Sequence, residues 1–225
     1  MAPAGVSLHA SRVPWRLLAG SGALAHDRAR AFAEPPHVDT AVDLLAGIAP
    51  HAILYAFTSS SYVLDAKEEE ALRARLEERA GGVPILLTGY AGISALRAVG
   101  AKRVAVIHPP WFSAQLSASG AQYYRRHGFE VAFCASMTPA RAFTEVPPSE
   151  VFDWARANVS RQADAVFIAG NGLRAVGVID ALEQTLGRPV LTANQVLLWQ
   201  ALERLGAADR VVQYGQVFRG RAVKR

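Results

Sequence analysis

HAILYAFTSSSY (residues 51–62) and DAVFIAGNGLRA (residues 164–175) are two versions of one pattern, and this repeat decides the fold. Each has a short apolar run, typical of a buried strand, followed by small polar residues where a turn into a helix is expected. A second matching pair follows, GGVPILLTGYAGISALRAVGAKRV (81–104) and LGRPVLTANQVLLWQALERLGAADRV (186–211). The duplication predicts two similar lobes related by an approximate two-fold axis, with their polar turns facing each other across a cleft.

Apolar strands alternate with helical segments along most of the chain. This alternation predicts an α/β fold in which two pseudo-symmetric, Rossmann-like lobes each contain a parallel sheet. We expect the first lobe over residues 1–100 and the second over residues 101–205, with residues 206–225 packing back on the first. Ligands bind outside the carboxyl ends of the strands in such folds, so the cleft between the lobes is the expected site.

The two predicted lobes differ at their starts. The second has a strand, a helix, another strand and another helix before its copy of the repeat. The first has only VSLHASRV (residues 6–13), whose alternating pattern predicts a half-buried strand, and one helix. By symmetry, the first lobe lacks an opening strand and helix. We therefore expect either that the natural protein begins upstream of Met1 or that its first lobe is incomplete, with unpaired backbone groups.

Composition excludes several classes of protein. The formal net charge is +5, but the basic residues are not interleaved with aromatic ones in a strip, so nucleic-acid binding is not expected. No apolar run is long enough for a membrane-spanning helix, and the start shows no signal-peptide pattern. The single cysteine excludes an internal disulfide and a cysteine-based zinc site, and it fits the reducing cytoplasm.

The first polar turn carries four consecutive hydroxyl residues, Thr58, Ser59, Ser60 and Ser61. Hydroxyls and backbone amides at a helix start can hold an anion, a carboxylate as well as a phosphate, although an ordinary helix cap is the simpler interpretation. Four hydroxyls exceed what a cap needs. We therefore predict that this turn binds substrate.

The second turn has Asn171 and Gly172 at the equivalent place, where an amide can donate and accept and a glycine permits close approach. Asn194 and its neighbour Gln195 follow the last strand and are expected to line the cleft. His108 ends an apolar strand before Pro-Pro-Trp and is the best-placed candidate for proton transfer, a structural histidine being the alternative. No phosphate loop, dinucleotide turn or metal-ligand cluster occurs, so no metal or cofactor is expected.

The TSxSY turn, RVAVIHPPWF and GNGLRA…LGRPVLTANQVLLWQAL together resemble the aspartate/glutamate racemase superfamily, in its branch of maleate cis-trans isomerases and arylmalonate decarboxylases. The resemblance implies a cofactor-independent enzyme for small carboxylates or dicarboxylates. It also implies catalysis by thiols, one in each lobe of the racemases and isomerases and one in the second lobe of the decarboxylases. The matching positions here are Phe57 and Gly170, so both catalytic cysteines are missing, and Cys134 lies within the apolar FEVAFCAS.

Three functions stay open on this basis. We favour the first, an isomerase or decarboxylase-like enzyme that acts on a small carboxylic acid or dicarboxylic acid without thiols. The second is a catalytically inactive carboxylate-binding paralogue of the superfamily. A structural role in a homodimer or higher homo-oligomer is the third. The residues do not say which acid is bound or whether any reaction follows.

Overall fold

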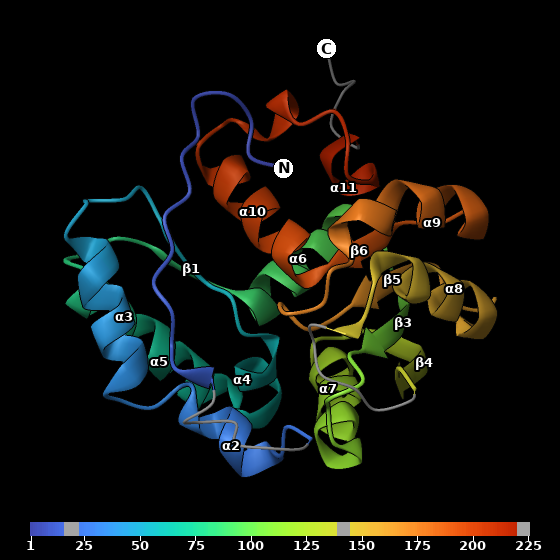
Figure 1. Cartoon of the computed structure of the whole chain (residues 1–225), viewed down its shortest axis with the longest axis horizontal. Helices are drawn as coiled ribbons and strands as arrows, with labels where there is room; N and C mark the ends of the chain where they lie inside the picture. Colours follow the sequence, from blue (N-terminus) through green and yellow to red (C-terminus); the bar gives the residue numbers. More distant parts are fainter. Residues whose placement is uncertain (16–22, 139–144, 220–225) are drawn as a thin grey trace.

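The computed structural model of the chain describes residues 1–15, 23–138 and 145–219, and it has an α/β fold with two parallel sheets (Figure 1). The predicted fold class is confirmed. The elements before residue 100 are α2 (His26–Ala31), α3 (His37–Ala46), β1 (Ile53–Tyr55), α4 (Thr58–Val63), α5 (Ala66–Arg79), β2 (Ile85–Leu87) and α6 (Thr88–Ala98).

The second half of the chain contributes the larger sheet. Its elements are β3 (Arg103–His108), α7 (Ala114–Arg126), β4 (Glu130–Ser136), α8 (Pro148–Asn158), β5 (Ala165–Ile168), the 3₁₀ turn η2 (Val176–Val178), α9 (Ile179–Leu186), β6 (Val190–Thr192), α10 (Ala193–Arg204), the 3₁₀ turn η3 (Ala208–Arg210) and α11 (Gln216–Arg219). Among the helices described, none is long and apolar enough to cross a bilayer.

The internal repeat is visible in the pairing of the strands. In β1, the Ile53 amide donates to the carbonyl of Pro84 at 2.9 Å; in β5, the Val166 amide donates to that of Pro189 at 2.9 Å. β1 and β5 are therefore equivalent. The second sheet has the order β4-β3-β5-β6, whereas β1 pairs with β2 alone in the described part of the chain. The Ala169 amide, just past β5, donates to the carbonyl of Ile107 in β3 at 2.8 Å.

Residues 6–13 do not form the predicted strand. The segment runs extended, and Leu8 is 64% exposed. A strand needs a neighbour that completes its ladder of hydrogen bonds. Residues 11–13 and β1 instead lie on the wall of one cavity, so no ladder joins them.

The two halves of the chain pack directly against each other along α6 and α10, which cross near the middle of the molecule (Figure 1). Gly92 of α6 lies so close to β5 that a Cβ atom there would come within 2.9 Å of the Phe167 ring. Close approach of this kind needs glycine. The contact fixes the carboxyl ends of the two sheets relative to each other.

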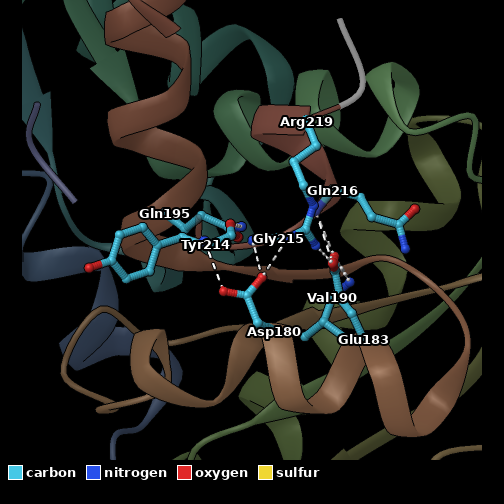
Figure 2. Close-up of polar contacts among 8 residues, drawn as sticks. All are labelled: Asp180, Glu183, Val190, Gln195, Tyr214, Gly215, Gln216 and Arg219. Atoms are coloured by element: carbon cyan, nitrogen blue, oxygen red, sulfur yellow. Dashed lines mark hydrogen bonds and ion pairs between the residues drawn. The ribbon is translucent and has the colours of Figure 1, made fainter. Parts of the chain in front are cut away.

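Two acidic residues of α9 hold the described part of the C-terminal segment (Figure 2). The Asp180 carboxylate accepts hydrogen bonds from the amides of Tyr214 at 3.1 Å and Gly215 at 3.0 Å. The Glu183 carboxylate, 3% exposed, accepts from the amide of Gln216 at 2.9 Å. Residues 214–216 therefore pack on α9, and the predicted packing of the segment on the first lobe stays a prediction; residues 220–225 lie outside the described residues.

The same two acids pair with Arg219. Its guanidinium lies 3.0 Å from Asp180 and 2.7 Å from Glu183. Glu183 also accepts from the amide of Val190 at 3.0 Å, at the start of β6. The Glu183 carboxylate thus joins α9, β6 and α11. A sequence pattern does not reveal these contacts, because most of the donors are backbone amides.

We predict that Glu183→Ala lowers the free energy of unfolding by about 3 kcal/mol, because buried amide donors lose their acceptor and Arg219 loses a partner. The matched control is Gln184→Ala, an exposed position on the same helix. Urea unfolding of both variants measures the difference. Equal stability of the two variants would contradict this role for Glu183.

Candidate functional site

A cavity of about 390 Å³ runs along β1 and reaches the turn that follows the carboxyl end of this strand. Its wall is mainly apolar and includes several aromatic rings. The apolar part of the wall includes Trp15, Phe32, Val42, Leu45, Phe57 and Trp111. An apolar cavity with a few polar groups at one end is the usual form of a small-molecule site.

The polar end of the cavity consists of the two turns that the repeat singled out. Thr58 and Ser59 start α4, Gly170, Asn171 and Gly172 follow β5, and Asn194 starts α10; all six line the cavity. The structure therefore brings together most of the residues chosen from the sequence. Whether they bind a ligand is a separate question, addressed below.

The side chain of Asn171 links these turns. Its Oδ1 accepts hydrogen bonds from the Thr58 amide at 2.9 Å and the Thr58 hydroxyl at 2.8 Å. Its Nδ2 donates to Asn194 Oδ1 at 2.9 Å, and Asn194 Nδ2 donates in return to the Asn171 carbonyl at 2.9 Å. The donors of Thr58 are therefore already satisfied by Asn171. We call these hydrogen bonds among Thr58, Asn171 and Asn194 the Asn171 bridge. Two other residues predicted from the sequence, Ser59 and Gly172, also line the cavity but take no part in this bridge.

α4 is short, and all six of its residues are buried. Its last carbonyls are bonded by two arginines from other helices. Arg126 of α7 donates to the carbonyls of Ser61 at 3.1 Å and Leu64 at 3.0 Å, and Arg30 of α2 donates to that of Val63 at 3.4 Å. Because a helix this short is marginal alone, these tertiary contacts determine where Thr58 and Ser59 lie.

Ser60 and Ser61 do not line the cavity, although the sequence placed them with Thr58 and Ser59. The Ser60 hydroxyl donates to the Phe57 carbonyl at 2.9 Å, a local bond at the helix start. Ser61 is buried, and a Cβ atom on Gly89 would overlap its hydroxyl. Of the four consecutive hydroxyl residues, the first two face the cavity and the last two face the protein interior.

Phe57 and Gly170, the positions that the sequence resemblance assigns to the family cysteines, both border the cavity. The Phe57 ring stacks on Phe32, with centroids 4.3 Å apart and planes 27° apart. Gly170 has φ +87°, and a Cβ atom there would lie 2.6 Å from Pro109 Cγ. The first position is therefore an aromatic wall, and the second tolerates only glycine without rearrangement of the adjoining turn.

His108 lies away from the cavity. The side chain is fully buried, its Nδ1 is 2.8 Å from the Ser117 hydroxyl, and its ring stacks on Phe112. Burial lowers the pKa of His108 to about 3, so it is neutral at pH 7. The expectation that His108 faces the cleft is not met, and the alternative of a structural histidine describes it better. Cys134 Sγ lies 3.7 Å from His108 Nδ1, also away from the cavity.

Gln195 does not line the cavity, and its side chain makes hydrogen bonds within the fold. Its Oε1 accepts from the Thr192 amide at 2.8 Å, and its Nε2 donates to the Tyr214 carbonyl at 2.5 Å. The first bond belongs to a capping box at the start of α10. The two bonds fix the helix start that carries Asn194, and they connect it to the C-terminal segment.

Sequence reasoning missed the residues of the cavity that come from the first 35 positions. Arg12 and Trp15 line it, as does Phe32. Of the described residues on its wall, Arg12 alone carries a full charge, and its side chain is exposed. No motif could have indicated these positions, because Arg12 lies in an irregular segment and Phe32 lies at the end of a short helix. Within the described ranges, no group of three or more His, Cys, Asp or Glu residues could hold a metal ion.

Comparison with known proteins identifies the family of this chain and its fold. The model of the arylmalonate decarboxylase family matches residues 31–218, and the chain therefore belongs to the arylmalonate decarboxylase family. A search of curated proteins gave no match. Solved structures of arylmalonate decarboxylase and of maleate isomerases have the same fold as this chain.

Three of these structures illustrate the likeness. A maleate isomerase from Pseudomonas putida S16, solved with maleate, has a TM-score of 0.79 and 20% identity over 89% of this chain and 82% of its own. A Nocardia farcinica maleate cis-trans isomerase with a covalently bound succinylcysteine intermediate has a TM-score of 0.74 and 24% identity over 82% and 78%. An arylmalonate decarboxylase has a TM-score of 0.70 and 20% identity over 87% and 83%. At these identities the likeness concerns the fold.

We predict that Gly170→Ala lowers stability more than Gly128→Ala does. Both glycines have nearly the same φ, +87° and +89°, but a Cβ atom meets nothing within 4 Å at Gly128. The difference therefore isolates the contact with Pro109, and we expect it to be about 1–3 kcal/mol in urea unfolding. Equal losses would mean that the turn yields to a side chain, and that a thiol could be accommodated at this position.

Proposed function

We propose that this protein binds a small carboxylic acid with an apolar body in the cavity between the two strand-end turns. The observation that carries the proposal is the division of one cavity into a polar end, made by both copies of the repeat, and a largely aromatic and aliphatic remainder. Membership of the arylmalonate decarboxylase family supports an acid as the ligand.

The polar end would receive the carboxylate. Ser59 supplies a hydroxyl, Gly172 permits close approach of the backbone, and Asn194 lies beside them. The bridge formed by Asn171 already satisfies Thr58, so we assign Thr58 to the support of the site and not to the ligand. The positive charge of Arg12 at the wall favours an anion over a neutral compound.

The apolar body would rest against the rings of Trp15, Phe32 and Phe57. A ring that buries about 150 Å² gains roughly 4 kcal/mol from the hydrophobic effect. A single exposed ion pair, as with Arg12, contributes about 0–1 kcal/mol. The apolar body therefore sets the affinity, and the polar end sets the orientation.

Binding without thiol chemistry follows from the residues at the two family positions. A thiol forms a covalent intermediate in the Nocardia isomerase, whereas the positions inferred to match the family cysteines hold Phe57 and Gly170 and the single cysteine, Cys134, lies elsewhere. We therefore favour the carboxylate-binding paralogue. The second candidate is a decarboxylase that takes its proton from water or the Ser59 hydroxyl, and family membership favours it. A cytoplasmic location, independence of cofactors and nucleic acid, and a homo-oligomeric state belong to the same proposal.

We predict that phenylacetate binds more tightly than acetate, which lacks the ring, and more tightly than phenylacetamide, which lacks the charge. Isothermal titration calorimetry measures all three. Ala41→Trp, which fills the apolar part of the cavity, should abolish binding of phenylacetate, and Ser59→Ala should weaken it about tenfold, the loss of one hydrogen bond to a charged group.

Ser60→Ala is the matched control, because Ser60 bonds to the Phe57 carbonyl and does not line the cavity. Its affinity should equal that of the wild type. Failure of every aromatic acid to bind would contradict the proposal. Release of CO₂ from phenylmalonate, followed by NMR and lost in Ser59→Ala, would replace the binding role by the enzymatic one.

A further inference from the structure

α4 faces the cavity through Thr58 and Ser59, and it faces a buried polar cluster through Ser61. We call this group the Glu69 cluster, and its members are Ser61 of α4, Glu69 of α5, and Tyr123 and Arg126 of α7. It lies where α4, α5 and α7 meet, with Gly89 of α6 packed against it. The proposed function makes no use of this cluster.

The cluster brings several polar groups together away from solvent. Both carboxylate oxygens of Glu69 and the hydroxyls of Ser61 and Tyr123 are buried and lack hydrogen bonds of full geometry, although both hydroxyls interact with the Glu69 carboxyl group and lower its pKa against the effect of burial. A buried polar group that is poorly hydrogen-bonded costs about 1–3 kcal/mol, and native proteins contain few of them. The burial of the Glu69 carboxyl group among them indicates that it is a functional feature.

Burial penalises the ionised form of Glu69, whose side chain is 1% exposed. This raises the pKa of Glu69 to about 7. The carboxyl group is therefore largely neutral at pH 6 and largely ionised at pH 8. The close packing of Gly89, where a Cβ atom would lie 2.5 Å from the Tyr123 hydroxyl and would overlap that of Ser61, keeps the cluster compact.

Arg126 connects the cluster to α4. Its guanidinium donates to the carbonyls of Ser61 at 3.1 Å and Leu64 at 3.0 Å, and it lies 3.7 Å from the Glu69 carboxylate, beyond hydrogen-bonding distance. It also lies over the Tyr123 ring, 4.7 Å from the centroid. One cation thus stands between two competing acceptors, the end of α4 and the carboxyl group.

We propose that Glu69 is a proton-linked positioning residue for α4. When its carboxyl group is neutral, Arg126 holds the last carbonyls of α4, and Thr58 and Ser59 are fixed at the cavity. When the carboxyl group ionises, the carboxylate draws Arg126 toward itself, and α4 loosens. The effect on ligand binding rests on the proposed function; the effect on α4 does not.

Apart from His127, the other titratable and charged groups around Glu69 keep their charge states between pH 6 and pH 8. Burial raises the pKa of Tyr90 of α6 and of Tyr123, so both stay neutral. Burial lowers the pKa of His127, the residue that follows α7. Glu70 and Arg73 of α5 form an ion pair, and Arg30 of α2 holds the Val63 carbonyl whatever the state of Glu69.

Hydrogen exchange of the α4 amides tests the proposal without any ligand. Protection factors, corrected for the intrinsic exchange rate, are measured by NMR at pH 6 and pH 8. We expect α4 protection to fall about tenfold in the wild type, as linkage gives for a pKa that returns from about 7 to its ordinary value when α4 opens. Glu69→Gln should abolish this fall, and α9 should show no change in either protein.

Glu70→Gln is the matched control, since it removes the neighbouring exposed carboxylate and should leave the tenfold fall intact. A wild type without the fall, or a Glu69→Gln variant that keeps it, overturns the proposal. Should Glu69→Gln not fold, the carboxyl ¹³C resonance of wild-type Glu69 decides. Its titration midpoint must coincide with the loss of α4 protection, and a midpoint below pH 5.5 overturns the proposal.

Affinity for phenylacetate at the two pH values then separates this inference from the proposed function. We expect weaker binding at pH 8 in the wild type and equal binding at both pH values in Glu69→Gln. If phenylacetate binds at neither pH while the exchange result holds, the proposed function fails and the positioning role of Glu69 stands. If phenylacetate binds equally at both pH values in the wild type, the proposed influence of Glu69 on the cavity is refuted.

Discussion

The side-chain amide of Asn171 is the interaction on which the site depends, because it joins the two copies of the repeat. Its oxygen accepts from both donors of Thr58, and its NH₂ group reaches Asn194. Such a network is strong where every member is satisfied and water is excluded. The starts of α4 and α10 and the turn after β5 are thereby held as one unit, and the cavity takes its polar end from that unit.

The same bridge explains how the cavity differs from one built around thiols. Phe57 presents a ring stacked on Phe32, and Gly170 lies against Pro109 where no side chain fits. The two positions that the family resemblance assigns to catalysis thus form an apolar wall and a close backbone contact. The chain has the family's fold, and the proposed site for an apolar acid lies where its two turns meet.

Sequence reasoning predicted the fold and half of the site. The repeat predicted the parallel sheets and the meeting of Thr58 with Asn171, because periodic apolar runs and symmetry are local signals. It did not predict the direction of Ser61 or the burial of His108, because those depend on which helices pack around α4 and β3. The position of Arg12 on the cavity wall could not be predicted for a similar reason, since its segment forms no regular element.

A crystal structure of the protein with phenylacetate would test the central claim most directly. The account predicts a carboxylate beside Ser59 and Gly172, a ring against Phe32 and Phe57, and an Asn171 bridge that is unchanged. A ligand bound elsewhere, or one whose carboxylate replaces Asn171 at the Thr58 amide, would contradict it.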